Sequence, residues 1–205
     1  MKLFLSLIIG YILGTLSPSA LLSKLKKQDF RGSGTGNLGA SNTLILLGKG
    51  YGALVMLFDI LKSFAAVKIA QALCPFVFYA GALAGFCAII GHIFPFYLKF
   101  KGGKGLASFG GMILGLSPLM FLMLLLLTLA LIIIINHSAA MPFTAGVLFP
   151  LLYGLKTENA WLVLIASGAS ILIMCTHFGN LKKAIKGEDM KIRDIIKKFI
   201  LKKGE

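Results

Sequence analysis

Long apolar runs separated by short, mostly basic segments constrain this chain more than any other feature of its sequence. A helix needs about 20 apolar residues to cross the hydrocarbon core of a bilayer. Only 14% of the 205 residues are charged and the mean hydropathy is +0.90, whereas about a quarter of a soluble domain is charged. The sequence therefore predicts an all-α integral membrane protein. The apolar runs cover residues 3–22, 51–73, 76–98, 106–135, 142–155 and 160–176.

The number of spans depends on how the longest run, 106–135, is divided. Ser117-Pro118 interrupts it, so it holds either one span or a short span, 106–116, followed by a full one, 118–135. A helix over 106–116 reaches only about 16 Å, about half of the core, so neighbouring helices must shield it. Nine Lys and Arg residues lie between 182 and 203. Because basic segments stay in the cytoplasm, this tail favours a seven-span helical bundle with one short span and a cytoplasmic C-terminus.

The N-terminal run, 3–22, has one Lys before it and four basic residues soon after it. A cleaved signal peptide is the alternative interpretation, but this imbalance predicts an uncleaved span with the N-terminus outside. We expect a single membrane-embedded domain over 1–205. Its tail, about 184–205, carries apolar residues at helical spacing among lysines, which predicts a basic amphipathic helix on the inner leaflet.

The net charge of +14 would suggest a nucleic-acid partner in a soluble protein. Here most basic residues lie between apolar runs, so membrane lipid and topology explain them, and we expect no nucleic acid. The three cysteines do not have CxxC spacing, and no HExxH motif occurs. We therefore expect no metal site and no cofactor.

A glycine-rich loop, DFRGSGTGNLGASN, covers residues 29–42. It contains a GxGxxG pattern from Gly34 to Gly39, but no strand precedes it as a dinucleotide-binding fold requires. Glycines, hydroxyls, amides and Arg31 together concentrate hydrogen-bond donors, as phosphate-binding loops require. A flexible linker would explain Gly and Ser, though less readily the asparagines and Arg31. We predict that this loop binds phosphate.

A second polar segment, GHIFPFYLKFKGGKGLASFG, covers residues 91–110 and holds three lysines and five glycines. Glycine lets backbone N–H groups approach an anion closely, and lysine adds positive charge. The alternative is an ordinary basic loop that obeys the positive-inside rule. His92, taken alone, is more typical of a hydrogen-bonded structural histidine than of a catalyst.

Two smaller polar clusters, 136–138 and 176–189, lie on the same side of the membrane in the seven-span topology. His177 and Asn180 are three residues apart and can point the same way from a helix end. This convergence predicts a site at the cytoplasmic interface, where a soluble anion meets a lipid-soluble partner. A transporter would instead place polar groups near mid-membrane. Asp59 and Lys62 share a helix face and form either a structural ion pair or part of the site.

Several known catalytic signatures do not occur in the sequence. Gly105 follows Lys104, so there is no GxxxxGK[ST] loop, and no GxSxG motif is present. No histidine is followed five residues later by an aspartate, as in the HxxxxD arrangement of many soluble thioester acyltransferases. Catalysis would then rest on positioning, charge neutralisation and at most one general base.

Three segments make the chain similar to the bacterial acyl-phosphate:glycerol-3-phosphate acyltransferases of the PlsY type. That family's first motif reads like DIRxxGSGNxGATN and is matched by the loop at 29–42 with identical spacing. The second, GHxFPxxxxFxGGKGxAT, is matched almost throughout from residue 91. The third, RHxxNIxRLxxGxE, is matched more loosely by THFGNLKKAIKGED from residue 176. The resemblance covers nearly the whole chain.

The resemblance implies an enzyme of the bacterial cell (inner) membrane with its active site facing the cytoplasm, and we expect it to be a monomer. It would transfer the acyl group of an acyl phosphate to the 1-hydroxyl of glycerol 3-phosphate, giving lysophosphatidic acid and phosphate, the first step of phospholipid synthesis. An acyl phosphate is already activated, so the hydroxyl would attack it directly. The implied catalytic residues are His177, Asn180 and Lys104. The implied substrate- and phosphate-binding residues are Arg31, Gly34, Thr35, Gly36, Asn37, Gly39, Ser41, Asn42, His92, Gly102, Gly103 and Ser138.

The chain departs from the family pattern at a few positions. Thr176 stands where the family has an arginine, which removes a charge from a phosphate site, and Lys183 replaces another arginine and loses bidentate geometry. These changes leave two alternatives: a divergent paralogue that acylates another phosphorylated acceptor, or one that binds lipid without catalysis. A transporter of phosphorylated compounds is a third alternative, which does not depend on these changes.

Overall fold

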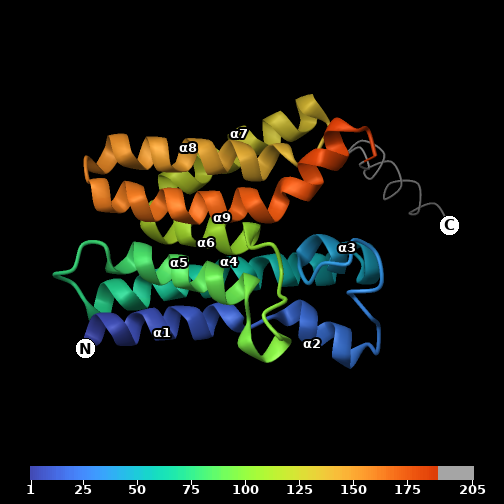
Figure 1. Ribbon diagram of the computed structural model, residues 1–205, viewed down its shortest axis with the longest axis horizontal. Coiled ribbons are helices and arrows are strands. Elements are labelled where there is room, and N and C mark those ends of the chain that lie inside the picture. Colours follow the sequence, from blue (N-terminus) through green and yellow to red (C-terminus); the bar gives the residue numbers. More distant parts are fainter. Residues whose placement is uncertain (189–205) are drawn as a thin grey trace.

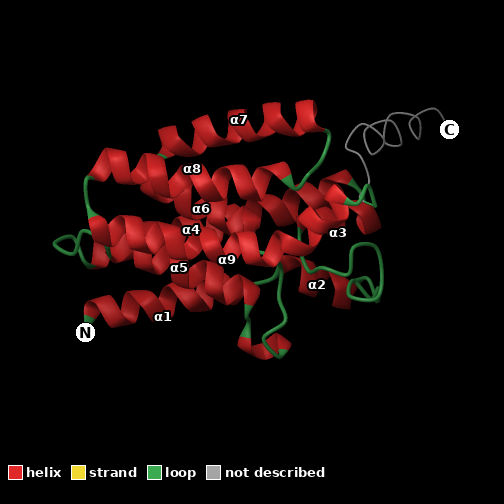
Figure 2. Ribbon diagram, turned by 45° about the horizontal axis from the view of Figure 1, so that its top comes forward, coloured by secondary structure: helices red, strands yellow, loops and turns green. Residues whose placement is uncertain are grey.

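The computed structural model describes residues 1–188 as a bundle of roughly parallel and antiparallel helices (Figures 1 and 2). Every regular element within these residues is helical, which confirms the all-α fold class. The amphipathic helix expected in the tail lies outside the described residues. The elements are α1 (Lys2–Thr15), α2 (Pro18–Leu25), α3 (Ala40–Leu47), α4 (Lys49–Leu73), α5 (Ala80–Ile93), the 3-10 helix η1 (Phe96–Leu98), α6 (Leu106–Leu116), α7 (Pro118–Ile135), α8 (Ala140–Thr157) and α9 (Ala160–Ile185).

Within residues 1–188, four helical segments are long and apolar enough to cross a membrane. The N-terminus and the end of α9 lie at opposite ends of the bundle (Figure 1), as an odd number of crossings requires. The count of seven and the orientation of the termini stay predictions. The four segments are Lys2–Leu25, Ala80–Leu98, Pro118–Ile135 and Ala160–Ile185.

The interruption at Ser117-Pro118 divides the longest apolar run as the sequence predicts. Ser117 is the N-cap of α7, where its hydroxyl oxygen accepts a hydrogen bond from the Met120 N–H, and Pro118 occupies the first helical position. The preceding helix, α6, has only 11 residues. It contacts α4, α5, α7 and α9, so neighbouring helices shield it, as its length demands.

The first apolar run, 3–22, lies within one candidate span, Lys2–Leu25, but this span holds two helices. α1 ends at Thr15 and α2 begins at Pro18, with Ser17 as the N-cap that accepts from the Ala20 N–H at 3.3 Å. Proline has no N–H to donate and its ring clashes with the preceding turn, so a helix must restart there. The break leaves the carbonyl group of Leu16 available to a side chain from another helix.

Small residues bring the helices close together. Gly10 and Gly14 of α1 face Ala84 and Ala88 of α5, where a Cβ on either glycine would collide with the α5 backbone. Gly111 of α6 lies against the backbone of α4 in the same way. Such small-residue contacts are how membrane helices gain packing area, because lipid gives no hydrophobic drive for their association.

The larger hydrophobic core joins α6 to α8 and α9. Phe109 and Phe149 are fully buried with ring centroids 5.5 Å apart, and Tyr153 stacks on Phe149 at 5.3 Å. Ile173 of α9 belongs to the same cluster. This packing fixes the last turns of α9 beside the loop that precedes α6, where the second and third polar segments meet.

Candidate active site

The 29–42 loop is folded around the side chain of Asn42, which is fully buried. Its Oδ1 accepts a hydrogen bond from the Thr35 N–H at 2.7 Å, and its Nδ2 donates to the Phe30 carbonyl at 2.7 Å. Gly34 and Gly36 take φ values of 63° and 70°, in the region that favours glycine. A Cβ on Gly34 would also collide with Asn42 Oδ1. Both ends of the Asn42 amide therefore shape the loop.

Exposed donors remain on the surface of this loop. Thr35 and Ser41 are exposed, and Asn37 is half-buried. Gly39 is the N-cap of α3, and the first turn of that helix, including Ser41, presents backbone N–H groups without an intrahelical partner. An anion is favoured at such a helix start.

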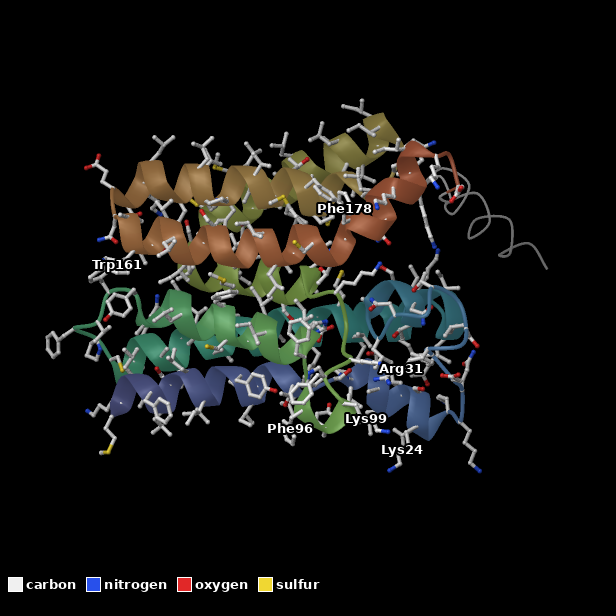
Figure 3. All side chains as sticks on the ribbon, viewed as in Figure 1. Lys24, Arg31, Phe96, Lys99, Trp161 and Phe178 are labelled. Carbon is white, nitrogen blue, oxygen red and sulfur yellow. The ribbon has the colours of Figure 1, made fainter. Side chains whose placement is uncertain are left out.

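Arg31 joins this loop to the second polar segment. Its Nη2 donates to the Lys101 carbonyl at 2.6 Å, a contact between residues 70 apart in the chain. The same nitrogen lies 3.5 Å from the Leu98 carbonyl. Arg31 is exposed, and Figure 3 shows its side chain between the two loops. The guanidinium group thus lies at the junction of the two predicted phosphate-binding segments.

Gly102 and Gly103 lead the chain into Lys104 by a tightly packed route. The Gly102 N–H donates to the Ile93 carbonyl at 2.9 Å, and the Gly103 N–H donates to the His92 carbonyl at 3.1 Å. A Cβ on Gly103 would collide with the His92 ring and the Leu38 carbonyl. Since both N–H groups already have carbonyl partners, close packing accounts for these two glycines.

Two side chains of α9 contact Lys104, one at its ammonium group and one at its backbone carbonyl group. Its Nζ donates to Asn180 Oδ1 at 2.6 Å. The hydroxyl group of Thr176 lies 2.8 Å from the Lys104 carbonyl and 2.9 Å from the Ile173 carbonyl. The structure therefore brings together Lys104 and Asn180, which the sequence separates by 76 residues.

His177 lies next to this contact with its ring buried. Its Nδ1 is 2.9 Å from the Ile173 carbonyl, which can only accept, so Nδ1 carries the proton. In the neutral ring, Nε2 is then the nitrogen with a lone pair, as a general base requires.

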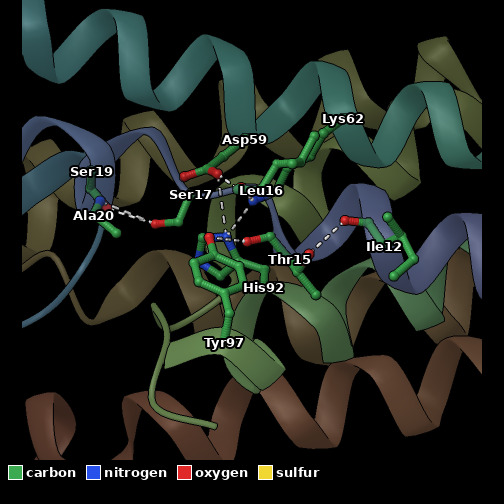
Figure 4. Close-up of polar contacts among 10 residues, drawn as sticks. All are labelled: Ile12, Thr15, Leu16, Ser17, Ser19, Ala20, Asp59, Lys62, His92 and Tyr97. Atoms are coloured by element: carbon green, nitrogen blue, oxygen red, sulfur yellow. Dashed lines mark hydrogen bonds and ion pairs between the residues drawn. The ribbon is translucent and has the colours of Figure 1, made fainter. Parts of the chain in front are cut away.

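His92 belongs to a different polar cluster, deep in the bundle (Figure 4). Lys62 Nζ lies 2.6 Å from Asp59 Oδ1, 2.9 Å from His92 Nδ1 and 2.7 Å from the Leu16 carbonyl. The three side chains of this buried triad are 2–7% exposed. The ion pair between Asp59 and Lys62 is confirmed, and it lies with the predicted structural histidine beneath the loop that carries Lys104.

Two tyrosines add further ties around the triad. The Tyr97 hydroxyl donates to the Thr15 carbonyl at 2.7 Å, and the Tyr11 hydroxyl donates to the Phe94 carbonyl at 2.9 Å. Both bonds join α1 to the segment after α5. The sequence analysis identified neither tyrosine, nor the tie from Thr176 to Lys104. The interruption at Ser17-Pro18 is the one sequence signal that could have indicated an available carbonyl near Thr15.

Ser138 is exposed in the loop between α7 and α8. Its neighbours in that loop line an apolar pocket of about 290 Å³ together with the end of α9, immediately after Asn180. The loop therefore lies against the same end of α9 as the candidate site. The lining residues are Ile135, His137, Ala139, Ala140, Phe143, Thr144, Leu181, Ala184 and Ile185.

Comparison with known proteins gives one consistent family. A family described as glycerol-3-phosphate acyltransferase matches residues 4–187. A glycerol-3-phosphate acyltransferase of Allorhizobium ampelinum is 37% identical over 194 residues, covering 93% of this chain and 92% of the relative. One of Bacillus subtilis is 29% identical over 197 residues, covering 94% and 99%.

Solved structures agree with the sequence relatives. The fold is similar to a crystal structure of PlsY, an integral membrane glycerol 3-phosphate acyltransferase, in its glycerol 3-phosphate form. The TM-score is 0.88 at 28% identity, over 94% of this chain and 96% of that one. The lysophosphatidic acid form of PlsY gives a TM-score of 0.84 over 93% and 95%.

Proposed function

The chain belongs to the glycerol-3-phosphate acyltransferase family, and from this premise we propose that it acylates glycerol 3-phosphate with an acyl phosphate as the donor. The 1-hydroxyl oxygen would attack the acyl carbonyl carbon, the bond from that carbon to the phosphate oxygen would break, and inorganic phosphate would leave. The products are lysophosphatidic acid and phosphate. Because the donor is a mixed anhydride, the reaction needs no covalent acyl-enzyme.

The contact of Lys104 with Asn180, one turn from His177, is the observation that supports this proposal most. It joins the second and third sequence motifs at one end of the bundle, beside the loop of the first. The Lys104 ammonium group stabilises the negative charge that develops on the donor during attack. Asn180 orients that ammonium group. His177 Nε2 takes the hydroxyl proton, unless a substrate phosphate takes it.

We assign phosphate binding to the groups that the structure leaves exposed. Arg31, Thr35 and Ser41, with the first turn of α3 after Gly39, surround one anion. Gly36 and Asn37 line the same loop, and Ser138 approaches from the loop after α7.

We assign a supporting role to five residues that the family resemblance placed among the substrate-binding groups. Asn42 and Gly34 shape the first loop. Gly102, Gly103 and His92 fix the path of the chain into Lys104. Their hydrogen bonds are made within the protein, so substitutions there would act through the position of the loops.

The proposed topology has seven spans, the N-terminus outside and the site facing the cytoplasm of a bacterial cell, with the protein acting as a monomer. The excess of basic residues after the first apolar run supports this orientation. Glycerol 3-phosphate would enter from the aqueous phase and the acyl phosphate from the lipid. Labelling of single cysteines at positions 37 and 104 from the cytoplasmic side tests the orientation.

The assay that tests the function supplies purified protein in detergent with palmitoyl phosphate and glycerol 3-phosphate. We expect inorganic phosphate and lysophosphatidic acid to form together, and His177→Ala to lower the rate by roughly 10²–10⁴-fold. Lys68→Ala is a matched control, since Lys68 is exposed on α4 and donates to Gln71. An intact fold without turnover would refute the proposal, and running other polyol phosphates alongside distinguishes a paralogue with a different acceptor.

The triad weighs against the transporter alternative. A transport path would need Asp59 and Lys62 to face a polar cavity. They are buried instead, and they bond to each other, to His92 and to the Leu16 carbonyl. Uptake of glycerol 3-phosphate into proteoliposomes without acyl transfer would instead support the transporter alternative.

A further inference from the structure

The segment between Phe94 and Lys101 leaves the bundle sideways. Figures 1 and 2 show it projecting across the helix axes past α1, with η1 at its tip in Figure 2. In the topology proposed above, the helix axes cross the membrane, so a loop that leaves the bundle sideways at the end of α5 lies at the membrane surface, whereas one that continues along the helix axis meets water. We propose that this 94–101 loop is an interfacial anchor that binds the headgroups of anionic lipids beside the active site.

The first observation is the exposure of aromatic rings along the loop. Phe96 is 54% exposed and Phe100 is 60% exposed, and Phe94 and Tyr97 are exposed as well. Large aromatic side chains gather at the membrane–water interface, where the ring meets both the acyl chains and the headgroups. Exposure of several neighbouring rings to bulk water would be unfavourable.

The second observation is a backbone conformation that turns side chains outward. Lys99 and Phe100 are consecutive non-glycine residues with φ of 55° and 56°. Such residues occupy this region only where their surroundings hold them. Here the Phe100 N–H donates to the Pro95 carbonyl at 3.1 Å, and Arg31 holds the Lys101 carbonyl. The result is that the Lys99 side chain and the Phe100 ring both face outward.

The third observation is positive charge on the same flank. Lys99 and Lys101 are exposed on the loop, and Lys24 is exposed on α2. Figure 3 shows Lys24 and Lys99 on the side of the molecule where Phe96 projects. Cations next to interfacial rings match the phosphate groups of anionic lipids, which lie just above the acyl chains.

The loop leads directly into the candidate site. Its two ends are joined by the hydrogen bond from the Gly102 N–H to the Ile93 carbonyl, and Lys104 follows two residues later. Lipid bound at the anchor would therefore adjoin the loop that presents Lys104. The anchor is independent of the proposed acyl transfer, because it rests on the exposed face of the loop.

The test places a fluorescent reporter in the loop. Trp161 is the only tryptophan and lies at the left end of the bundle in Figure 3, away from Phe96. The variant Trp161→Phe/Phe96→Trp is reconstituted into phosphatidylcholine vesicles that contain brominated phosphatidylglycerol or, at the same fraction, brominated phosphatidylcholine. We expect blue-shifted emission and roughly twofold stronger quenching by the anionic lipid.

Matched variants separate the charge effect from simple proximity to lipid. Lys24→Gln/Lys99→Gln should abolish the preference for the anionic lipid, and high salt should weaken it. Lys68→Gln, on the distant end of α4, should leave it unchanged. Equal quenching by the two lipids, or the emission of a water-exposed indole quenched by neither, would overturn the proposal. Phe100→Trp is a second reporter, and gel filtration with the phosphate-release assay checks that each variant is folded.

Discussion

Two buried or half-buried lysines, Lys62 and Lys104, lie in opposite settings. Lys62 is buried in the bundle, where its ammonium group contacts the Asp59 carboxylate, the His92 ring and the Leu16 carbonyl. Lys104 is half-buried near one end of the bundle and donates to the neutral amide of Asn180, next to His177. Each lysine therefore has a histidine nearby, but the Lys62 contact with Asp59 is an ion pair, whereas the Lys104 contact with Asn180 is a hydrogen bond to a neutral amide.

The difference shows how similar groups can have different tasks. A buried charge is tolerated when an opposite charge and hydrogen bonds compensate it, and Asp59 does this for Lys62. The triad thereby holds the break between α1 and α2 against α4 and α5. The Asn180 amide, by contrast, orients the Lys104 ammonium group through a hydrogen bond and brings no charge of its own, which suits the role in phosphate chemistry that we propose for Lys104.

The largest effect should come from breaking the triad. Asp59→Ala leaves Lys62 buried without its counter-charge and should lower the free energy of unfolding by about 3–5 kcal/mol. Thermal or denaturant unfolding in detergent measures this. The double variant Asp59→Leu/Lys62→Met removes both charges and should recover most of the loss. An unfolding midpoint unchanged in Asp59→Ala would show that the pair does not stabilise the fold.

The corresponding substitution at the candidate site should lower the rate of acyl transfer and leave the stability of the fold nearly unchanged. Lys104→Ala should lower kcat/KM for phosphate release by roughly 10²–10³-fold, because a donor to the developing charge is lost. Its unfolding midpoint should stay close to that of Lys68→Ala. A near-normal rate would remove Lys104 from the catalytic group and with it the contrast between the two lysines.

A smaller effect should come from a substitution in the 29–42 loop, which lies beside the segment that carries Lys104. Asn42→Ala leaves the Thr35 N–H and the Phe30 carbonyl without their partner in a buried place, which should cost about 1–3 kcal/mol of stability. KM for glycerol 3-phosphate should rise because the loop loses its shape. Ser41→Ala is the control, since Ser41 is exposed and should change KM with little loss of stability.

The smallest effect should come from removing the hydrogen bond that the Thr176 hydroxyl of α9 donates to the Lys104 carbonyl. Thr176→Val keeps the shape and removes the hydroxyl, so we expect a loss of about 1 kcal/mol and a roughly fivefold lower rate. Thr176→Ser keeps the hydroxyl and should restore the rate. Equal rates in the valine and serine variants would mean that this hydrogen bond does not position Lys104.

Much of the architecture follows from the sequence alone. Ser117-Pro118 identified the short helix α6, because a proline without an N–H and a serine cap act on adjacent residues. Because Asp59 and Lys62 are three apart and share a helix face, the sequence left two alternatives, an ion pair or a place in the site, and the structure shows the ion pair. The density of glycines and donors at 29–42 and 91–110 indicated two segments that meet in the structure at the candidate site. All of these signals depend on neighbours within a few residues.

The tertiary structure decided which donors are available to a substrate. Asn42, Gly102 and Gly103 resemble phosphate ligands in the sequence, yet their hydrogen bonds are made to carbonyl and N–H groups of the protein. The packing of helices distant in the chain places His92 against Lys62 and Thr176 against the backbone of Lys104. A local pattern specifies a donor and its helix, but its partner depends on which helices pack together, and that is set by the whole bundle.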